Sequence, residues 1–337
     1  MTRRLVVKLL VTGGAGYVGG VVSAMLLDAG HDVVILDDLS TGHEVALPPG
    51  ARFVRGRVHE AVEAVLTAGL DAILHFAAFI EAGESVRRPE KYWENNTIGS
   101  LRLIDAARAA GVRRIIFSGT AAVYGDPDEV PIPETAAARP PNPYAASKLA
   151  VDHALTGEAN AHGLAAVTLR YFNVCGAYLP ASGPAYGERH DPESHLIPIA
   201  LQVASGRREK LQLFGDDYPT PDGTCIRDYI HIEDLARAHL LALDAVQPGE
   251  HRIYNLGNGR GFSNRQVIEV VREVTGHPVP VEVAPRRSGD PAVLVASAEK
   301  AAAELGWVPA KPALPDMVAD AWTFHQQTIA GPQTIAG

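Results

Sequence analysis

Two side chains four positions apart, Tyr144 and Lys148, are the pair in this sequence best suited to acid–base chemistry. Positions i and i+4 project from one face of a helix, and Pro143 is typical of a first helical turn. A phenol with a pKa of about 10 is a poor base at neutral pH, but a neighbouring ammonium favours the phenolate. A surface lysine above a packed tyrosine is the alternative, because this spacing is common by chance.

Three glycines, Gly13, Gly16 and Gly19, stand between the apolar run 5–11 and a helical pattern at 17–29. Residues without Cβ let the backbone approach a pyrophosphate, whose charge then lies at a helix N-terminus. The spacing is one residue longer than G-x-G-x-x-G. A tight strand–helix turn without a ligand is the alternative interpretation.

An acidic residue, Asp37, ends the next apolar run at 33–36, 18 residues after Gly19. Its carboxylate can accept hydrogen bonds from both hydroxyls of an adenosine ribose. A 2′-phosphate there would be repelled by Asp37 and Asp38. These residues therefore favour NAD over NADP.

Short apolar runs alternate with helical stretches over the first 175 residues. The runs are 5–11, 33–36, 52–54, 72–76, 114–117 and 166–171, and the clearest helices are 17–29 and 92–110. Strands without polar alternation are typical of parallel sheets covered by helices on both faces. The alternation indicates βαβ units, so we predict an α/β fold with a doubly wound parallel sheet of the Rossmann type.

From about Gly176 the sequence changes to Pro- and Gly-rich loops with single helices, such as 197–205 and 264–275. A strand at 252–256 is expected to return to the main sheet. We predict a smaller, discontinuous substrate-binding lobe, with a ligand cleft between the two lobes. The expected boundaries are a cofactor domain at 1–175 rejoined by 226–258, a lobe from 176–225 and 259–325, and a frayed tail at 326–337.

The composition of the 337 residues excludes several classes of protein. A hydrophobic share of 47% argues against a disordered chain, and a net charge of −9 argues against nucleic-acid binding through a basic face. Cys175 and Cys225 lack zinc-type spacing, so neither a disulfide framework nor a structural metal is indicated. No apolar run approaches the ~18 residues of a membrane span, and 5–11 is too short for a signal peptide. We expect a cytoplasmic protein.

Several motifs together resemble the extended short-chain dehydrogenase/reductase family. They are Thr-Gly-Gly-Ala-Gly-Tyr-Val-Gly at 12–19, His-Phe-Ala-Ala at 75–78, Tyr-x-x-x-Lys at 144–148 and Tyr-Phe-Asn at 171–173. Arg-Asp-Tyr-Ile-His at 227–231 and Arg-Arg-x-Gly-Asp at 286–290 are similar to its nucleotide-sugar 4-epimerases. The resemblance covers residues 5–325. It implies an NAD-dependent isomerase that interconverts UDP-galactose and UDP-glucose through a 4-keto sugar, with tightly bound NAD and no net redox.

The resemblance also implies roles for individual residues. Thr120 would bind the sugar 4-hydroxyl, Tyr144 would take its proton, and Lys148 would bind the nicotinamide ribose and hold the phenolate. The implied NAD contacts are Gly13, Gly16, Tyr17, Val18, Gly19, Asp37, Asp38, Ser40, Gly56, Arg57, Phe76, Ala77, Ala78, Asn95, Thr120, Tyr144, Lys148, Tyr171 and Phe172. The implied substrate contacts are Thr120, Tyr144, Asn173, His195, Leu196, Phe214, Arg227, Arg287, Asp290 and Leu294.

Within that substrate set, Asn173 and Arg227 would hold the diphosphate and Phe214 would contact uracil, with Arg287 and Asp290 completing the nucleotide site. A salt bridge to Asp228 is the alternative for Arg227, and a turn or cap is the alternative for Asn173.

The sequence departs from the family pattern at three places. Arg57 follows Gly56 where an acidic residue usually binds adenine, so Arg57 stacks on the adenine or NAD binds more weakly. A lysine often found after the fourth strand is absent, since Ile80 and Glu81 occupy that stretch. The usual amide pair near the uridine reads Ser194-His195, and a histidine can still donate to a phosphate.

Other activities on the same fold remain open. A 4,6-dehydratase needs a carboxylate beside Thr120, but Ala121 and Ala122 follow it. An NAD-sensing protein without turnover typically loses the tyrosine or the lysine, and both are present. Leu294, of intermediate size, favours UDP-glucose and UDP-galactose over UDP-GlcNAc, and a UDP-pentose is a further alternative.

Family resemblance also implies a homodimer. Its contact would be a four-helix one between helices at 92–110 and 142–160. Apolar residues at helical spacing on these helices are Ile98, Leu101, Leu149 and Val151, and core packing against the sheet is the alternative for them.

Overall fold

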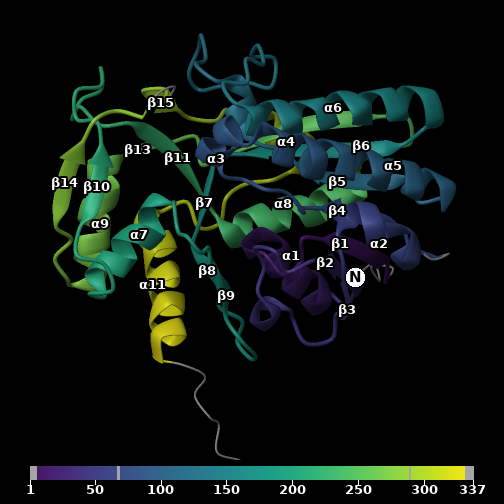
Figure 1. Ribbon diagram of the computed structural model, residues 1–337, viewed down its shortest axis with the longest axis horizontal. Coiled ribbons are helices and arrows are strands. Elements are labelled where there is room, and N and C mark those ends of the chain that lie inside the picture. The colour runs from purple at the N-terminus through teal and green to yellow at the C-terminus, as the bar shows by residue number, and fades with distance from the viewer. Residues whose placement is uncertain (1–5, 67–68, 288–289, 331–337) are drawn as a thin grey trace, which may run out of the picture.

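The structure is a computed structural model, and it describes residues 6–66, 69–287 and 290–330. Its main sheet has seven parallel strands in the order β12-β6-β5-β4-β1-β2-β3 (Figure 1). They are β1 (Lys8–Thr12), β2 (Asp32–Asp37), β3 (Arg52–Arg55), β4 (Ala72–His75), β5 (Arg114–Ser118), β6 (Ala165–Tyr171) and β12 (His251–Leu256). The strand order reverses between β1 and β4, where open α/β sheets place their ligands. The predicted doubly wound fold is confirmed.

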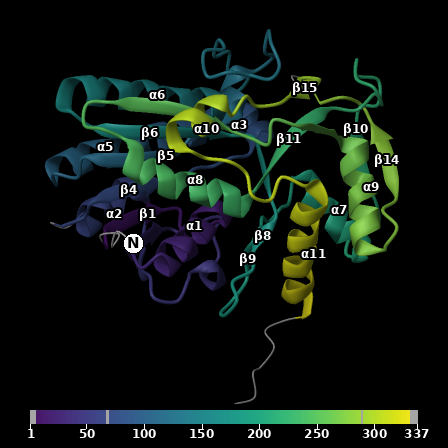
Figure 2. The ribbon, with the colours of Figure 1, turned by 180° about the vertical axis from the view of Figure 1, so that it is seen from behind.

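Helices cover both faces of this sheet because alternate residues of its strands are apolar and buried. Leu9 and Val11 of β1 belong to one buried cluster with α1 and α8, and Leu10 belongs to a second with α2, α5 and α6. Figure 2 shows α1 and α8 on one side of the sheet and α5 and α6 on the other. These helices are α1 (Tyr17–Asp28), α2 (Val58–Val65), α5 (Gly99–Ala109), α6 (Pro143–His162) and α8 (Ile232–Ala245).

The single helix expected at 92–110 is divided in the structure. A π-helical turn, η2 (Trp93–Ile98), joins α4 (Pro89–Tyr92) to α5. Asn96 in this turn is 1% exposed. Its side chain accepts a 2.9 Å hydrogen bond from the Phe79 N–H and donates to the Phe79 carbonyl and to Ser147 Oγ. The π turn therefore aims a buried amide at the loop after β4, which helical periodicity alone does not predict.

A smaller lobe with its own buried cluster follows residue 172. One sheet contains β7 (Asn173–Cys175), β11 (Ile226–His231), β13 (Gly261–Ser263) and β15 (Val293–Leu294), and a second pairs β10 (Leu211–Phe214) with β14 (Val281–Ala284). The helices packed there are α7 (Leu196–Ala204), α9 (Asn264–Thr275) and α11 (Leu314–Ala330). Remaining elements are η1 (Glu44–Ala46), α3 (Ala82–Arg87), η3 (Ala121–Tyr124), β8 (Ala177–Tyr178), β9 (Tyr186–Gly187) and α10 (Glu299–Leu305).

Two expectations about the C-terminal half need correction. The strand expected at 252–256 is β12, which pairs in parallel with β6, but β11 pairs with β7, β13 and β15 instead of the main sheet. Residues 226–258 therefore do not return to the main sheet as one piece. The tail expected from 326 is helical in α11 as far as Ala330, and 331–337 lie outside the described residues.

The ends of the other predicted elements differ by a few residues. The run 5–11 corresponds to β1, which begins at Lys8, and residue 5 lies outside the described residues. Among the helices of the described ranges, none is both long enough and apolar enough to cross a membrane.

Candidate active site

The predicted cofactor residues gather at one edge of the main sheet, because parallel strands all end there. They are Gly13, Gly16, Tyr17, Val18 and Gly19 after β1; Asp37, Asp38 and Ser40 at or after the end of β2; Gly56 and Arg57 after β3; Phe76, Ala77 and Ala78 after β4; Thr120 after β5; and Tyr171 and Phe172 at the end of β6. Asn95 lies in η2, and Tyr144 and Lys148 lie in α6. Residues dispersed over the first half of the chain thus share one site.

The turn between β1 and α1 has a backbone that only glycine permits at two positions. Gly13 has a φ of +74°, and a Cβ there would lie 2.5 Å from the backbone nitrogen of Ala77. A Cβ on Gly19 would lie 2.2 Å from the carbonyl oxygen of Gly13. Gly16 is the N-cap of α1, where no side chain caps the helix. The first N–H groups of α1 can therefore bind an anion.

Asp37 lies at the end of β2, with one carboxylate oxygen bonded to this turn and the other to the backbone after β2. Oδ2 accepts a hydrogen bond from the Ala15 N–H at 3.0 Å, and Oδ1 accepts one from the Leu39 N–H at 2.8 Å. Burial raises the pKa of Asp37, although these two bonds oppose that rise. Each oxygen keeps a lone pair for a ribose hydroxyl. Arg57, the departure from the family pattern, forms an ion pair with Asp38 at 3.6 Å.

A buried hydrogen-bonded chain below the turn was missed in the sequence analysis. His75 Nδ1 lies 2.6 Å from Thr12 Oγ1, and His75 Nε2 lies 2.7 Å from Ser100 Oγ. Because Ser100 donates its own proton to the Asn96 carbonyl, it accepts from Nε2, and Thr12 must donate to Nδ1. Burial, helped by the charge of Lys148, lowers the pKa of His75 to about 3, so the ring is neutral. The signal in the sequence was a histidine at the end of a wholly apolar strand.

Tyr144 and Lys148 are positioned by the start of α6. Asn142 caps this helix by accepting a 2.9 Å hydrogen bond from the Ala145 N–H, and Pro143 occupies the first turn. Lys148 is 3% exposed and donates to the carbonyl oxygen of Ser118 at 2.8 Å. Burial lowers the pKa of Lys148 to about 7, with Asp152 opposing the change. The alternative of a surface lysine is thereby excluded.

Thr120 and Tyr144 interact with each other near the start of α6. Burial raises the pKa of Tyr144, the hydrogen bond with Thr120 lowers it, and the charge of Glu81 raises it further. Nearby, the hydroxyl of Tyr171 shares a hydrogen bond with Ser118 Oγ. With its pKa raised, the phenol of Tyr144 holds its proton at neutral pH unless a positive charge acts on it.

Apart from Thr120 and Tyr144, the predicted substrate residues come from the smaller lobe. Asn173 begins β7, Arg227 lies in β11, Leu294 lies in β15, Phe214 ends β10, and Arg287 and Asp290 lie between β14 and β15; Gly289 lies outside the described residues. The structure brings together the members of two pairs. The Arg287 guanidinium lies 4.0 Å from the Phe214 ring centre, and Arg227 Nη2 lies 3.4 Å from Asp290 Oδ1.

The alternative of an ion pair between Arg227 and Asp228 is wrong. Asp228 is fully buried and accepts hydrogen bonds from three backbone N–H groups, those of Asn258, Gly259 and Ala296, at 2.7 to 3.0 Å. It therefore holds the loop after β12, and Arg227 has Asp290 as its acidic partner.

His195 lies at the N-terminus of α7, next to Leu196, but its ring is engaged elsewhere. Its Nδ1 pairs with Glu188, which also lies 2.9 Å from His190 Nδ1. Although burial opposes the change, the charges of both histidines hold the pKa of Glu188 at about 2. The expected donation from His195 to a phosphate would therefore require this pair to open. The sequence analysis missed Glu188, His190 and Glu193, which the spacing E-x-H-x-x-E-x-H could have shown.

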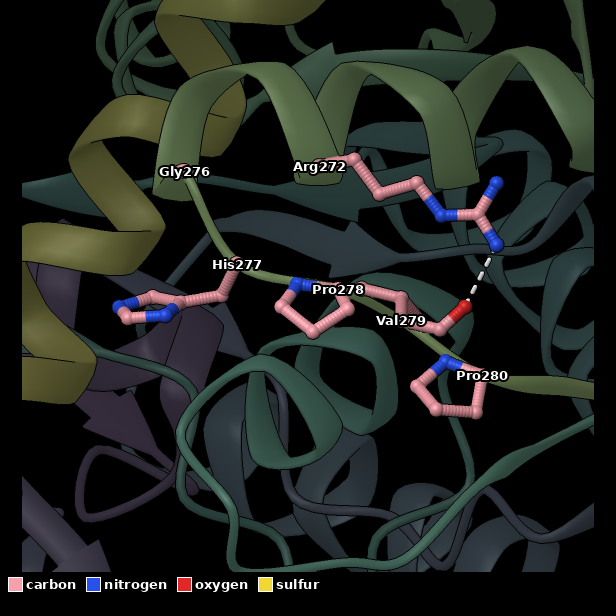
Figure 3. A pocket seen from close by; sticks show the side chains of 6 residues that line it. All are labelled: Arg272, Gly276, His277, Pro278, Val279 and Pro280. Atoms are coloured by element: carbon pink, nitrogen blue, oxygen red, sulfur yellow. Dashed lines mark hydrogen bonds between the residues drawn. The ribbon is translucent and has the colours of Figure 1, made fainter.

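A surface hollow lies apart from these residues, where α9 ends and the chain runs toward β14 (Figure 3). Arg272 donates to the Val279 carbonyl across it at 2.6 Å, and the other lining residues are Gly276, His277, Pro278 and Pro280. None of the predicted site residues lines this hollow.

Comparison with known proteins agrees with this arrangement. Residues 9–257 match the model of the NAD dependent epimerase/dehydratase family. A Corynebacterium glutamicum protein named UDP-glucose 4-epimerase is 57% identical over 318 residues, 94% of this chain and 95% of that protein. A Streptomyces lividans protein of the same name is 58% identical over 330 residues, 96% and 98% of the two.

A solved structure is similar along nearly the whole chain. It is the UDP-glucose 4-epimerase from Bifidobacterium longum in complex with NAD+ and UDP. The TM-score is 0.89 at 36% identity, and the match covers 96% of this chain and 99% of that one.

Proposed function

The chain belongs to the NAD dependent epimerase/dehydratase family, and from this premise we propose that it interconverts UDP-galactose and UDP-glucose. The reaction inverts C4 through a 4-keto sugar, with NAD held throughout the cycle and no net redox. The observation that carries this proposal is that Thr120, Tyr144 and Lys148 lie where β5 ends and α6 begins, one strand away from the reversal point between β1 and β4.

The turn after β1 fits the NAD that the family uses. Side chains at Gly13 and Gly19 would collide with backbone, so these positions keep the close approach that a pyrophosphate needs. The uncapped start of α1 supplies N–H donors, and Asp37 supplies acceptors for the adenosine ribose. Bound NAD would accept a hydride from C4 and return it to the opposite face, and its positive ring would favour a phenolate nearby.

Tyr144 acts as the base that removes the proton of the 4-hydroxyl. A hydride leaves readily only from an alkoxide-like carbon, so the base must contact the hydroxyl on the same carbon. Thr120 shares a hydrogen bond with the phenol and orients it. The ammonium of Lys148, held in place by the Ser118 carbonyl, favours the phenolate. Returning the proton to the 4-oxygen completes the cycle.

Residues of the smaller lobe hold the UDP portion. Arg227 and Asn173 bind the diphosphate, and Phe214 beside Arg287 contacts uracil. With these contacts confined to the nucleotide, the keto sugar can turn over between the two hydride transfers. We assign NAD binding to 1–175 and nucleotide-sugar binding to the lobe beyond it. The alternative of a 4,6-dehydratase is disfavoured, because the apolar Ala121 and Ala122 follow Thr120.

We also propose a cytoplasmic homodimer. Ile98 and Leu101 are 50% and 40% exposed on successive turns of η2 and α5, and Leu149 of α6 is half-buried. Val151 belongs to the core instead, at 1% exposed. The exposed Ile98 and Leu101 suit a contact of η2 and α5 with a second copy, whereas Leu149 of α6 packs partly against a buried cluster of its own chain. Light scattering at micromolar concentration tests it, and a monomer mass would contradict it.

Turnover without added coenzyme tests the activity. The purified protein is mixed with UDP-galactose, and UDP-glucose is measured by chromatography. We expect conversion in both directions and a kcat about 10²–10⁴-fold lower in Tyr144→Phe. Tyr178→Phe is the matched control, because it also removes one phenol hydroxyl, but one that is bonded to Asp28 and is not among the predicted site residues. Its kcat should equal that of the wild type. Normal turnover in Tyr144→Phe would refute the assignment of the base.

A further inference from the structure

We propose that Glu188, His190, Glu193 and His195 form a binding site for one divalent transition-metal ion, of which Zn²⁺ is the first candidate. All four residues lie in the loop between β9 and α7, and one ligand atom from each lies within 4.8 Å of the others. The site is structural in our proposal and takes no part in the hydride or proton transfers described above.

The separations between these ligand atoms suit a tetrahedral ion. Zinc bonds of about 2.0–2.2 Å require ligand atoms roughly 3.3–3.6 Å apart. Glu193 Oε1 lies 3.6 Å from His195 Nδ1 and 3.9 Å from His190 Nδ1, close to this range. Glu188 Oε1 lies 2.5 Å from His195 Nδ1 and 2.9 Å from His190 Nδ1, hydrogen-bond distances that would lengthen when an ion enters. Small side-chain rotations would therefore bring all four atoms onto one ion.

The two carboxylates of the cluster are more buried than its two imidazoles, and one imidazole nitrogen lacks an aligned partner. The carboxylate side chains of Glu188 and Glu193 are only 8% and 5% exposed. Both imidazoles converge on the same oxygen of Glu188, and the buried His190 Nδ1 makes no well-aligned hydrogen bond within the described residues. A divalent cation would displace the protons that these imidazoles share with Glu188, after which two nitrogen lone pairs and two carboxylates would face one point.

The backbone already holds one of the ligands in place. Glu193 Oε1 accepts hydrogen bonds from the N–H groups of Ser194 and His195, both at 2.8 Å. Such outer contacts orient a ligating carboxylate before an ion arrives. Two imidazoles in the set favour zinc and its neighbours over Mg²⁺ and Ca²⁺, which prefer oxygen ligands.

An ion at this position would fasten the loop to the cofactor-binding half of the chain. The Arg189 carbonyl accepts a 2.6 Å hydrogen bond from His43 Nε2, and Ser194 Oγ donates to Glu81 at 3.2 Å. His195 directly precedes α7, so the ion would also fix the N-terminus of that helix.

A second cluster of possible ligands in the described residues provides a matched control. His231, Glu233 and Asp320 also lie within 4.8 Å of one another. There, however, Lys311 Nζ donates to Glu233 at 2.8 Å and to Asp320 at 2.7 Å. An ammonium thus occupies the place of a cation, and His231→Gln should leave metal binding unchanged.

The test is a zinc titration of the untagged full-length protein. The protein is freed of metal with a chelator and titrated with Zn²⁺ against a chromophoric competitor, and bound zinc is counted by mass spectrometry. We expect one ion per chain. Loss of a direct ligand in His190→Gln should weaken zinc binding by more than the roughly 100-fold that loss of an outer contact costs, and His231→Gln should bind zinc like the wild type. The thermal midpoint of the wild type should rise with zinc and that of His190→Gln should not.

Two outcomes would overturn the proposal. One is equal zinc affinity in wild type and His190→Gln, and the other is less than one ion per chain at saturation. Should His190→Gln fail to fold, Co²⁺ added to the wild-type protein gives an independent measurement. Visible absorption bands of tetrahedral Co²⁺ support the site, and an octahedral aquo spectrum contradicts it. Neither result depends on epimerase turnover, so the two proposals fail separately.

Discussion

Lys148 of α6 donates a 2.8 Å hydrogen bond to the carbonyl oxygen of Ser118, the last residue of β5. This bond fixes the rotation and height of the helix against the strand end. Tyr144 lies one turn earlier on α6, and Thr120 lies two residues beyond Ser118. The contact between a buried lysine and one backbone carbonyl therefore holds the helix that carries Tyr144, our proposed base, against the strand that leads to Thr120.

The buried ammonium of Lys148 should make stability depend on pH. Its pKa falls from 10.5 to about 7 on burial, so between these values the unfolded chain binds more protons than the folded one. The free energy of unfolding of the nucleotide-free protein should then rise from pH 7 to pH 9. Lys148→Met should lack this rise, and urea unfolding at both pH values measures it. An equal slope in both proteins would show that Lys148 keeps its charge.

A second pH dependence, with the same cause and the same sign, should come from His75. Its pKa is lowered to about 3 while an unfolded histidine titrates near ~6.5, so the stability it supplies above ~6.5 is lost as the pH falls. We expect a loss of about 2 kcal/mol between pH 6.5 and 5 from this residue. His75→Gln should show a shallower loss in urea unfolding. The exposed His153→Gln is the control and should keep the wild-type slope.

The main sheet could be predicted because its strands are apolar on both faces and its glycines mark a turn that needs them. β1, α1 and β2 follow directly from that pattern. The sheet to which β11 belongs could not be predicted, because the sequence of a buried strand is the same whichever sheet it joins. Only its observed pairing with β7 and β13 assigns it to the smaller lobe. The turn at 93–98 keeps helical periodicity and so hides its π geometry.

Chemistry at the site was predicted where the residues were close in sequence or marked by motifs. Tyr144 and Lys148 share a helix, so their spacing was informative. The hydrogen-bond partners of His75 could not be predicted in this way, because Thr12 and Ser100 are 63 and 25 residues away from it along the chain. The pairing of Phe214 with Arg287 likewise depends on two strands, β10 and β14, that the sequence did not indicate.

Gly19→Ala should abolish the retention of NAD. Its Cβ would lie 2.2 Å from the Gly13 carbonyl oxygen, so the turn must open and its N–H groups lose their common direction. Mass spectrometry of nucleotide released by heat measures NAD per chain, which should fall from near one to near zero. Gly157→Ala, on α6 with nothing within 4 Å of the new Cβ, should keep its NAD. NAD retained by Gly19→Ala would remove the turn from the cofactor site.

Substitution of Leu294 should change the choice of sugar. Leu294 lies in β15, paired with Arg227 in β11, and its half-buried side chain packs against the buried cluster that contains Val123 and Tyr124. A leucine there leaves little room for an N-acetyl group on C2, and rejection by one such contact is worth about 10–200-fold. We expect the wild type to favour UDP-galactose over UDP-GalNAc in kcat/KM.

Leu294→Ala should narrow that preference by at least about tenfold, mainly by raising kcat/KM for UDP-GalNAc. Val293→Ala, one position earlier on the same strand and paired with Ile226, removes similar apolar volume and should leave the ratio unchanged. Competition between the two sugars in one reaction, followed by chromatography, gives the ratio directly. If both variants shifted it equally, general loosening of β15 would be responsible and Leu294 would have no specific contact with the sugar.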